Sequence, residues 1–262
     1  MKKYFILFGF VSAIIFFGCG KGKISVTLAG STAFQPFAEK IADEYMKTNP
    51  NVTITVQGGG SAVGIQSANS GAAQIGMADL VILPEEAKSL TSIVVAQDGI
   101  ALVVNPKNKV ENLSIEQLRN IFNGKIINWK EVGGIDALIT VVSREAGSGT
   151  RSSFEKIITG ITLTNNAVIQ NSNGTIRETV ANDENSIGYI SHGILNEKVK
   201  ALKIDNVECT SESIIAQKYT LVRPIFLLTK GAPEGEAKKF IEYILTPEIQ
   251  SMIKKDGLLP AK

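Results

Sequence analysis

The 262-residue sequence predicts an α/β protein, because runs of β-branched residues alternate with amphipathic helical patterns along the whole chain. A second observation is that three of the predicted strands are followed by glycine beside serine or threonine, and then by a helix. These loops cover residues 30–32, 58–61 and 147–150. A third observation is that Asp79 ends another predicted strand.

The first part of the chain repeats a strand–turn–helix unit. Alternating β-branched residues predict the strands, and apolar residues at spacings of three and four predict the helices. Pro36 fits only the first turn of its helix, so Ser31 or Thr32 is the expected N-cap. The elements expected before residue 106 are strands at 24–29, 51–57, 74–80, 92–97 and 99–105, and helices at 34–47, at 62–71 and from Pro84.

The second part of the chain continues the alternation. Ser114 is expected to cap a helix that ends at Asn123 and Gly124. Pro224 lies inside an apolar strand pattern, which indicates a strand at the edge of a sheet. The region up to Tyr219 is polar and has no assigned element. The elements expected here are strands at 139–143, 187–191 and 222–229, and helices at 114–122, from Thr150, at 175–181, at 233–245 and from 247 to 257.

The loops that follow the strands form a candidate anion site. In open α/β sheets a ligand lies beyond the carboxyl ends of the strands, where helix N-termini present unpaired backbone N–H groups. The stretch VVSREAGSGTR at 141–151 adds the guanidinium of Arg144 and the hydroxyls of Ser148 and Thr150. One such loop alone is an ordinary glycine turn, but three of them with Arg144 and Asp79 favour a small oxyanion.

The composition excludes several classes of site. His192 is the one histidine, and Cys19 and Cys209 are the two cysteines, so a zinc site with several such ligands cannot be assembled. A serine hydrolase would depend on His192 as its base. The formal net charge of +2 disappears when Lys2 and Lys3 are removed with the leader. A neutral protein has no global field that attracts nucleic acid or anionic lipid.

The N-terminus predicts export. In residues 1–18 two lysines precede an apolar run, which is typical of a signal peptide and short for a membrane span. Cys19 follows this run and resembles a bacterial lipoprotein processing site. That resemblance implies cleavage before Cys19, acylation of its thiol and amine, and a tether at residues 19–22. Cys209 then has no partner and is expected to be a small core residue.

Stretches spread over nearly the whole mature chain match one known family in the family's own order. They are AGSTAFQPF, VQGGGSAVGI, QIGMADL, DGIALVVN, LRNIFNGKIINWKEVGG, VVSREAGSGTRSSF, SIGYIS and RPIFLLTK. The chain thereby resembles the bacterial phosphate-binding proteins of the high-affinity ABC phosphate importer. The segment before Trp129 and the SGTR loop are the most specific of these matches.

The resemblance implies a type II periplasmic-binding-protein fold, in which two crossover segments join two α/β lobes and the ligand lies in the cleft between them. One lobe is expected to comprise residues 23–103 and 223–262, and the other residues 104–222. The crossovers are expected near residues 103–106 and 221–224.

The resemblance also implies the residues that contact phosphate. They are Thr32, Ala33, Ser61, Asp79, Arg144, Ser148, Gly149 and Thr150. The chain departs from some members at two positions. Ala33 stands where they carry an aromatic residue, and Ala146 stands where they carry an aspartate that pairs with the arginine, so that Glu145 is the nearest carboxylate.

Asp79 is expected to select phosphate, because a carboxylate only accepts hydrogen bonds and phosphate near neutral pH still has a proton to donate. Sulfate has none, and would leave like charges buried against each other. The expected function is capture of inorganic phosphate and its delivery to the permease subunits of an ABC importer. The carrier is expected to be a monomer, lipid-anchored on the periplasmic side of the inner membrane, without enzymatic activity, cofactor, metal or nucleic-acid partner.

Other functions stay open at this point. The site could take another oxyanion such as sulfate or molybdate, although a carboxylate in the cleft argues against it. An enzyme that uses Ser148 would lack metal ligands and a second histidine. The glycines from Gly58 suggest a nucleotide only weakly, since no acidic residue follows at the required offset. A surface lipoprotein that binds host partners is a further possibility.

Overall fold

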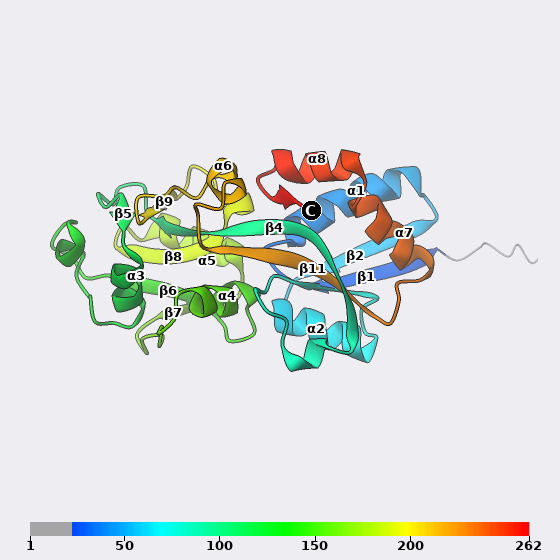
Figure 1. The fold of residues 1–262 in the computed structure, drawn as a ribbon, viewed down its shortest axis with the longest axis horizontal. Helices are drawn as coiled ribbons and strands as arrows, with labels where there is room; N and C mark the ends of the chain where they lie inside the picture. Colours follow the sequence, from blue (N-terminus) through cyan, green and yellow to red (C-terminus); the bar gives the residue numbers. More distant parts are fainter. Residues whose placement is uncertain (1–22, 262) are drawn as a thin grey trace, which may run out of the picture.

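The computed structural model describes residues 23–261. The predicted signal peptide at 1–18, the predicted lipidation at Cys19 and the tether at 19–22 lie outside the described residues. Helices and strands alternate along the described chain, which confirms the predicted α/β class (Figure 1).

The strands and helices have the following bounds. The strands are β1 (Ile24–Gly30), β2 (Val52–Gln57), β3 (Ile75–Ala78), β4 (Leu90–Val104), β5 (Asn112–Leu113), β6 (Thr140–Arg144), β7 (Val168–Gln170), β8 (Ser186–Ser191), β9 (Lys200–Ala201), β10 (Lys203–Ile204), β11 (Val222–Lys230) and β12 (Leu259–Pro260). The α-helices are α1 (Gln35–Thr48), α2 (Ser61–Ser70), α3 (Ile115–Phe122), α4 (Gly149–Ile157), α5 (Asn173–Asn182), α6 (Ser211–Ile215), α7 (Gly235–Ile244) and α8 (Pro247–Lys255). Short 3₁₀ helices lie at Glu85–Ala87, Trp129–Val132 and His192–Ile194.

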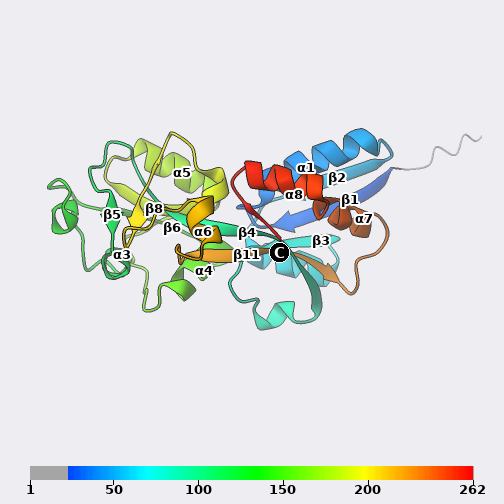
Figure 2. The same cartoon turned by 45° about the horizontal axis from the view of Figure 1, so that its top comes forward.

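One large mixed sheet runs through the molecule in the order β2-β1-β3-β11-β4-β8-β6-β7, and β9 and β12 also pair with β4. Strands β1, β2 and β3 are parallel to one another, as are β6, β7 and β8. The long strands β4 and β11 are antiparallel and lie side by side along the centre (Figure 1 and Figure 2). We call the elements around β1–β3, α1, α2, α7 and α8 the first half, and those around β6–β8 and α3–α5 the second half.

Each half has its own hydrophobic core. In the first half, Val26 of β1 and Ile41 of α1 pack with Phe240 of α7. In the second half, Phe154 of α4 stacks on Tyr189 of β8 with ring centroids 4.4 Å apart. The site described below lies where these two independently packed bodies meet.

The central strands pass from one core to the other. In β4, Val95 packs in the core of the first half and Ile100 in that of the second. Beside it, Leu221 packs in the second core and Ile225 in the first. The two halves are therefore joined by a pair of neighbouring strands that share a ladder of backbone hydrogen bonds.

Two expectations about these central strands are wrong. The expected strands at 92–97 and 99–105 form the single strand β4. The polar Asp98 does not mark a turn, because it lies in the ladder directly opposite Arg223 of β11 and pairs with it.

The second wrong expectation is that Pro224 marks an edge strand, since β11 lies in the middle of the sheet between β3 and β4. The proline is tolerated because β3 pairs only with positions 226–228 of β11, so Pro224 has β4 alone as a neighbour. A shift in register follows between Ile225 and Phe226. The local surroundings of Pro224 are those of an edge although the strand as a whole is central.

Several boundaries also differ from the sequence expectation. Helix α5 begins at Asn173 rather than at Thr175, because the Ser172 hydroxyl accepts a hydrogen bond from the Thr175 N–H at 3.0 Å. The helix expected from Pro84 is only a 3₁₀ turn. The strands β5, β7, β9 and β10 have two or three residues each, which is too short for alternation to show, and α6 lies in the polar region.

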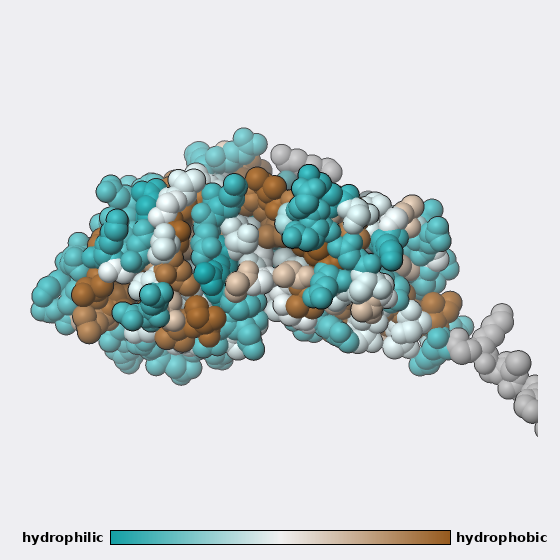
Figure 3. All heavy atoms as spheres, turned by 90° about the horizontal axis from the view of Figure 1, so that it is seen from below, coloured by the Kyte–Doolittle hydropathy of each residue, from teal (hydrophilic) through white to brown (hydrophobic). Residues whose placement is uncertain are grey.

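The large apolar side chains belong mainly to the two cores. Figure 3 shows one face of the molecule, on which hydrophilic and hydrophobic residues are interspersed over both halves. Within residues 23–261, none of the helices combines the length and the apolar character that a membrane span needs. Cys209 is buried and has no disulfide partner in this part of the chain, as expected.

Candidate functional site

The carboxyl ends of the parallel strands in the two halves face each other across the centre of the molecule. Loops after β1, β2 and β3 come from the first half, and loops after β6 and β7 come from the second. Direct contacts bring Ser61, Asp79, Gly149 and Thr150 together, and Asn173 links Thr32 to them. All of the sequence-predicted site residues are buried. The polar ones have exposed fractions of 1% for Ser61, Arg144, Ser148 and Thr150, 2% for Asp79 and 9% for Thr32.

The Asp79 carboxylate is the centre of this arrangement. Ser61 at the start of α2 donates from Oγ to Oδ1 at 2.8 Å, and accepts from the Asp79 N–H at 3.0 Å. Thr150 in the first turn of α4 donates from Oγ1 to Oδ2 at 3.0 Å. Since Ser61 belongs to the first half and Thr150 to the second, one carboxylate ties both halves together.

Ser61 can reach Asp79 because α2 lies very close to the sheet. A Cβ atom on Gly64 would lie 2.4 Å from the carbonyl oxygen of Met77 and 2.9 Å from that of Ala29. Only glycine fits at this helix position without displacing backbone. The glycine that the sequence supplies after Ser61 therefore sets the distance between the helix start and the end of β3.

A second contact between the halves uses Asn173, which the sequence analysis did not identify. From the N-terminus of α5, its Nδ2 donates to Thr32 Oγ1 at 3.1 Å and to Thr150 Oγ1 at 3.3 Å. Its Oδ1 accepts from the Ser191 N–H at 3.0 Å. The sequence signal was present, because NSNGT at 171–175 repeats the pattern of a polar, glycine-containing loop before a helix.

The guanidinium of Arg144 is held at the end of β6 with one nitrogen left over. Its Nε and Nη2 each donate to the Glu145 carboxylate at 2.8 Å, so Glu145 fills the role of the aspartate missing at Ala146. Nη2 also lies 3.4 Å from the carbonyl oxygen of Asn171. Nη1 is buried and has no hydrogen-bond acceptor among the residues that the structure describes. A buried donor without an acceptor is costly, so this atom points to a missing anionic partner.

Two other predicted phosphate contacts, Ala33 and Ser148, form hydrogen bonds within the protein. The Ala33 N–H donates to Ser31 Oγ at 3.2 Å within the turn before α1, and the expectation that Ser31 or Thr32 is the N-cap is wrong, because α1 starts later, with Phe34 at the N-cap and no side-chain cap bond. Ser148 caps α4, because its Oγ accepts from the Arg151 N–H at 3.3 Å. A hydroxyl that accepts a cap bond still has its own proton to donate. Gly149 and Thr150 open α4, where backbone N–H groups lack acceptors inside the helix.

Behind Asp79 lies a buried pair of charges on the central strands. Arg223 donates from Nη2 to Asp98 Oδ2 at 2.8 Å, and its Nη1 lies 2.9 Å from Asp79 Oδ2. Ser191 donates from Oγ to Asp98 Oδ1 at 2.8 Å. Burial raises the pKa of the Asp98 carboxyl, although Arg223 and Ser191 both act to lower it. A lone aspartate in the apolar run of β4 and a lone arginine in β11 were the sequence signal for this pair.

The two halves approach each other closely through glycines. A Cβ atom on Gly149 would lie 2.1 Å from Ser61 Oγ and 2.7 Å from the Asp79 carbonyl oxygen. The Ala62 N–H donates to the carbonyl oxygen of Gly147 at 3.1 Å. These contacts bring the loops of both halves directly against each other around Asp79.

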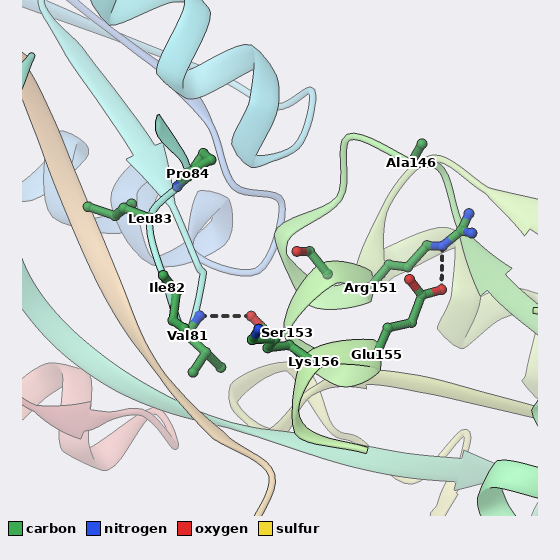
Figure 4. A pocket seen from close by; sticks show the side chains of 10 residues that line it. Val81, Ile82, Leu83, Pro84, Ala146, Arg151, Ser153, Glu155 and Lys156 are labelled. Carbon is green, nitrogen blue, oxygen red and sulfur yellow. Dashed lines mark hydrogen bonds and ion pairs between the residues drawn. The ribbon is translucent and has the colours of Figure 1, made fainter. Parts of the chain in front are cut away.

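A crevice of about 510 Å³ opens beside these contacts, between residues 81–84 and helix α4 (Figure 4). Ser153 of α4 spans its inner end, where its Oγ donates to the Asp79 carbonyl oxygen at 3.1 Å and accepts from the Val81 N–H at 3.1 Å. Arg151 and Glu155 pair along its other wall at 2.7 Å. The crevice runs along the seam where the two halves meet at the site.

The chemistry of the site suits a small anion that can also donate a hydrogen bond. Helix N-termini, hydroxyls and Arg144 supply donors, and the Asp79 carboxylate supplies an acceptor. Within residues 23–261, no group of three His, Cys, Asp or Glu side chains is arranged to hold a metal ion. His192 lies outside the site, where its Nδ1 is 2.7 Å from the carbonyl oxygen of Gly257.

Comparisons with known proteins agree with this architecture. The chain matches the model of the PBP superfamily domain over residues 19–248. It is 37% identical over 245 residues to the phosphate-binding protein PstS of Bacillus subtilis, which covers 92% of this chain and 82% of that protein.

Solved structures with the same fold are also similar in sequence. A Clostridium perfringens protein, described as a phosphate ABC transporter substrate-binding protein with bound phosphate, has a TM-score of 0.87 and 40% identity over 91% of this chain and 100% of that chain. An ABC-type phosphate transport receptor from Vibrio cholerae has a TM-score of 0.74 and 34% identity over 90% of this chain and 100% of that chain. The predicted type II periplasmic-binding-protein fold is confirmed. The chain belongs to the PBP superfamily and, within it, to the family of bacterial phosphate-binding proteins.

Proposed function

We propose that this protein binds inorganic phosphate in the cavity around Asp79 and Arg144 and delivers it to an ABC importer. The observation that carries the proposal is Arg144 Nη1, a donor on a side chain with 1% exposure and without an acceptor in the described chain. A tetrahedral oxyanion supplies that acceptor, and its other oxygens can take the N–H groups and hydroxyl protons at the start of α4. The names of the relatives, which say phosphate, support the same ligand.

Asp79 argues for phosphate over a fully deprotonated anion. Its oxygens already accept from Ser61 and Thr150, yet a carboxylate offers about four acceptor positions, so it can also accept from a P–O–H group. Sulfate or molybdate without a proton would place negative charge against a buried carboxylate. We therefore rank these oxyanions below phosphate.

We also propose that the two halves move as lobes. The core contacts indicate that the chain crosses from one lobe to the other at residues 96–100 of β4 and at residues 221–225 on the β11 side. The first crossing lies a few residues before the crossover expected at 103–106. Each half holds only part of the anion contacts, so binding favours the joined arrangement.

The same proposal includes the lipid anchor. Acylation of Cys19 would hold the mature, monomeric chain at the outer side of the bacterial inner membrane, next to the permease subunits. This rests on the sequence pattern at residues 1–19.

Titration calorimetry of the chain from residue 20 onward tests the ligand. We expect phosphate to bind one to one, and Arg144→Met to weaken binding by about a hundredfold or more, because truncating a buried charged partner costs about 2–5 kcal/mol. Arg119→Met, on α3 with its Nε bonded to the Thr159 carbonyl, is the matched control and should bind normally. A wild-type chain that binds no phosphate contradicts the proposal.

Asp79→Ala tests the selectivity. We expect the ratio of the sulfate Kd to the phosphate Kd to fall by about tenfold or more, since the repulsion against sulfate is removed. Asp136→Ala removes an exposed carboxylate in the second half and should leave the ratio unchanged. An unchanged ratio in Asp79→Ala shows that another group discriminates.

Gly149→Ala tests the joined arrangement. The added Cβ would overlap Ser61 Oγ at 2.1 Å, so the halves cannot meet while each core stays intact. We expect small-angle scattering to show compaction with phosphate for the wild type and none for this variant. Gly174→Ala, whose Cβ would lie 3.7 Å from Ser172 Oγ, should compact normally. No compaction of the wild type with phosphate contradicts lobe closure, and equal compaction of all three chains shows that closure does not need the close contact at Gly149.

Cys19→Ser tests the anchor in cells that process lipoproteins. We expect this variant of the full chain to move from the membrane fraction to the soluble fraction after export, because it loses its acyl chains. Cys209→Ser, at a buried thiol, should stay with the membrane. Membrane retention of Cys19→Ser would mean that another segment holds the protein there.

A further inference from the structure

Arg223 is a buried arginine outside the predicted anion contacts, and it connects the central strands to Asp79. It lies opposite Asp98 in the ladder between β11 and β4. Its Nη2 donates to Asp98 Oδ2 at 2.8 Å, and its Nη1 lies 2.9 Å from Asp79 Oδ2. The exposed fractions are 1% for Arg223 and Asp98 and 2% for Asp79. The guanidinium therefore bridges two buried carboxylates at the place where both strands pass between the cores.

The two carboxylates need this cation. Burial raises the pKa of Asp98 most, and the negative charge of Asp79 adds to that effect, whereas Arg223 opposes both. Like charges in one buried site cannot both stay ionised without a partner of opposite charge. Ser191 of β8 donates to the other oxygen of Asp98, so the pair is also fixed to the second half.

The contact with Asp79 differs from an ordinary hydrogen bond. Although Arg223 Nη1 is within ion-pair distance of Oδ2, neither Nη1 nor Nε has a hydrogen-bond acceptor in the described part of the chain. Arg223 thus acts on Asp79 mainly through its charge. The hydroxyls of Ser61 and Thr150 provide the directional bonds to that carboxylate.

We infer that Arg223 is a positioning residue that determines the specificity of the site by holding the Asp79 carboxylate in place, facing the anion. This inference rests on the proposed phosphate function. Without the guanidinium, the buried carboxylates of Asp79 and Asp98 have no cation between them to balance their charges, so Asp79 loses its fixed position. A displaced Asp79 carboxylate no longer sets its charge against a sulfate ion, so sulfate becomes an acceptable ligand.

Calorimetry with phosphate and with sulfate tests the inference on wild type, Arg223→Met and Arg223→Lys. We expect the ratio of the sulfate Kd to the phosphate Kd to fall by about tenfold or more in Arg223→Met, because the displaced carboxylate no longer repels sulfate. Arg223→Lys should recover part of the ratio, because an ammonium keeps the charge but cannot bridge two carboxylates in the same way. Arg119→Met is the matched control and should keep the wild-type ratio.

A double-mutant cycle shows whether Arg223 acts through Asp79. In an Asp79→Ala background, Arg223→Met should change the ratio by less than about threefold, because the group it acts on is gone. Phosphate and sulfate affinities that fall equally in Arg223→Met would instead identify a direct anion contact and overturn the inference. If Arg223→Met does not fold, Arg223→Gln, which stays polar but carries no charge, replaces it, and a wild-type ratio in Arg223→Gln overturns the inference as well. A wild-type chain without phosphate binding removes the proposed function and this inference together, whereas normal wild-type binding with unchanged Arg223 variants removes the inference alone.

Discussion

The structure depends on hydrogen bonds from both halves to one buried carboxylate. Asp79 directly follows β3 in the first half, and it accepts from Ser61 of that half and from Thr150 of the second. The two donors lie in the first turns of α2 and α4, and any larger side chain at Gly64 or Gly149 would separate them from the acceptor. These two helix glycines are thus requirements of a single close contact.

Burying that carboxylate creates a need for further charges. Arg223 lies against Asp79 and is itself balanced by Asp98 on the neighbouring strand. On the opposite wall, Arg144 is balanced by Glu145, whose side chain keeps 30% exposure to solvent. The pair Arg223–Asp98 is fully buried, whereas the pair Arg144–Glu145 borders solvent. Solvent therefore screens the charges of the second pair much more than those of the first.

The sequence predicts most of the fold because its strong signals are local. Alternation of β-branched residues, the Ser114 cap and the glycine loops each act over a few residues. The expectations about Pro224 and Asp98 are wrong for the same reason, because both residues are tolerated in their strands through segments far along the chain. Pro224 is tolerated because β3 is short, and Asp98 because it pairs with Arg223. Tertiary pairing overrides the local preference at both positions.

The same distinction applies to the site. Residues at the ends of recognisable strands, such as Asp79 and Arg144, could be predicted and are buried in the structure. Asn173 follows β7, whose three residues are too few to show a pattern, so its loop is not recognised as a strand end. The partner of Arg144 also depends on geometry. Sequence alone does not show that the side chain of the adjacent Glu145 can turn back and accept hydrogen bonds from Arg144 with both oxygens.

The ribbon of β4 and β11 has a consequence for the kinetics of exchange. Its two strands stay paired from Leu90 and Lys230 to Gly99 and Val222, with one shift in register. A twist of such a ribbon requires no peptide group to trade its partner for water, so the proposed opening of the two halves has little backbone cost. The dwell time of a captured ion is then governed by a few side chains at the seam. Single substitutions of these side chains would change the rate at which the bound ion is released without altering the fold of either half.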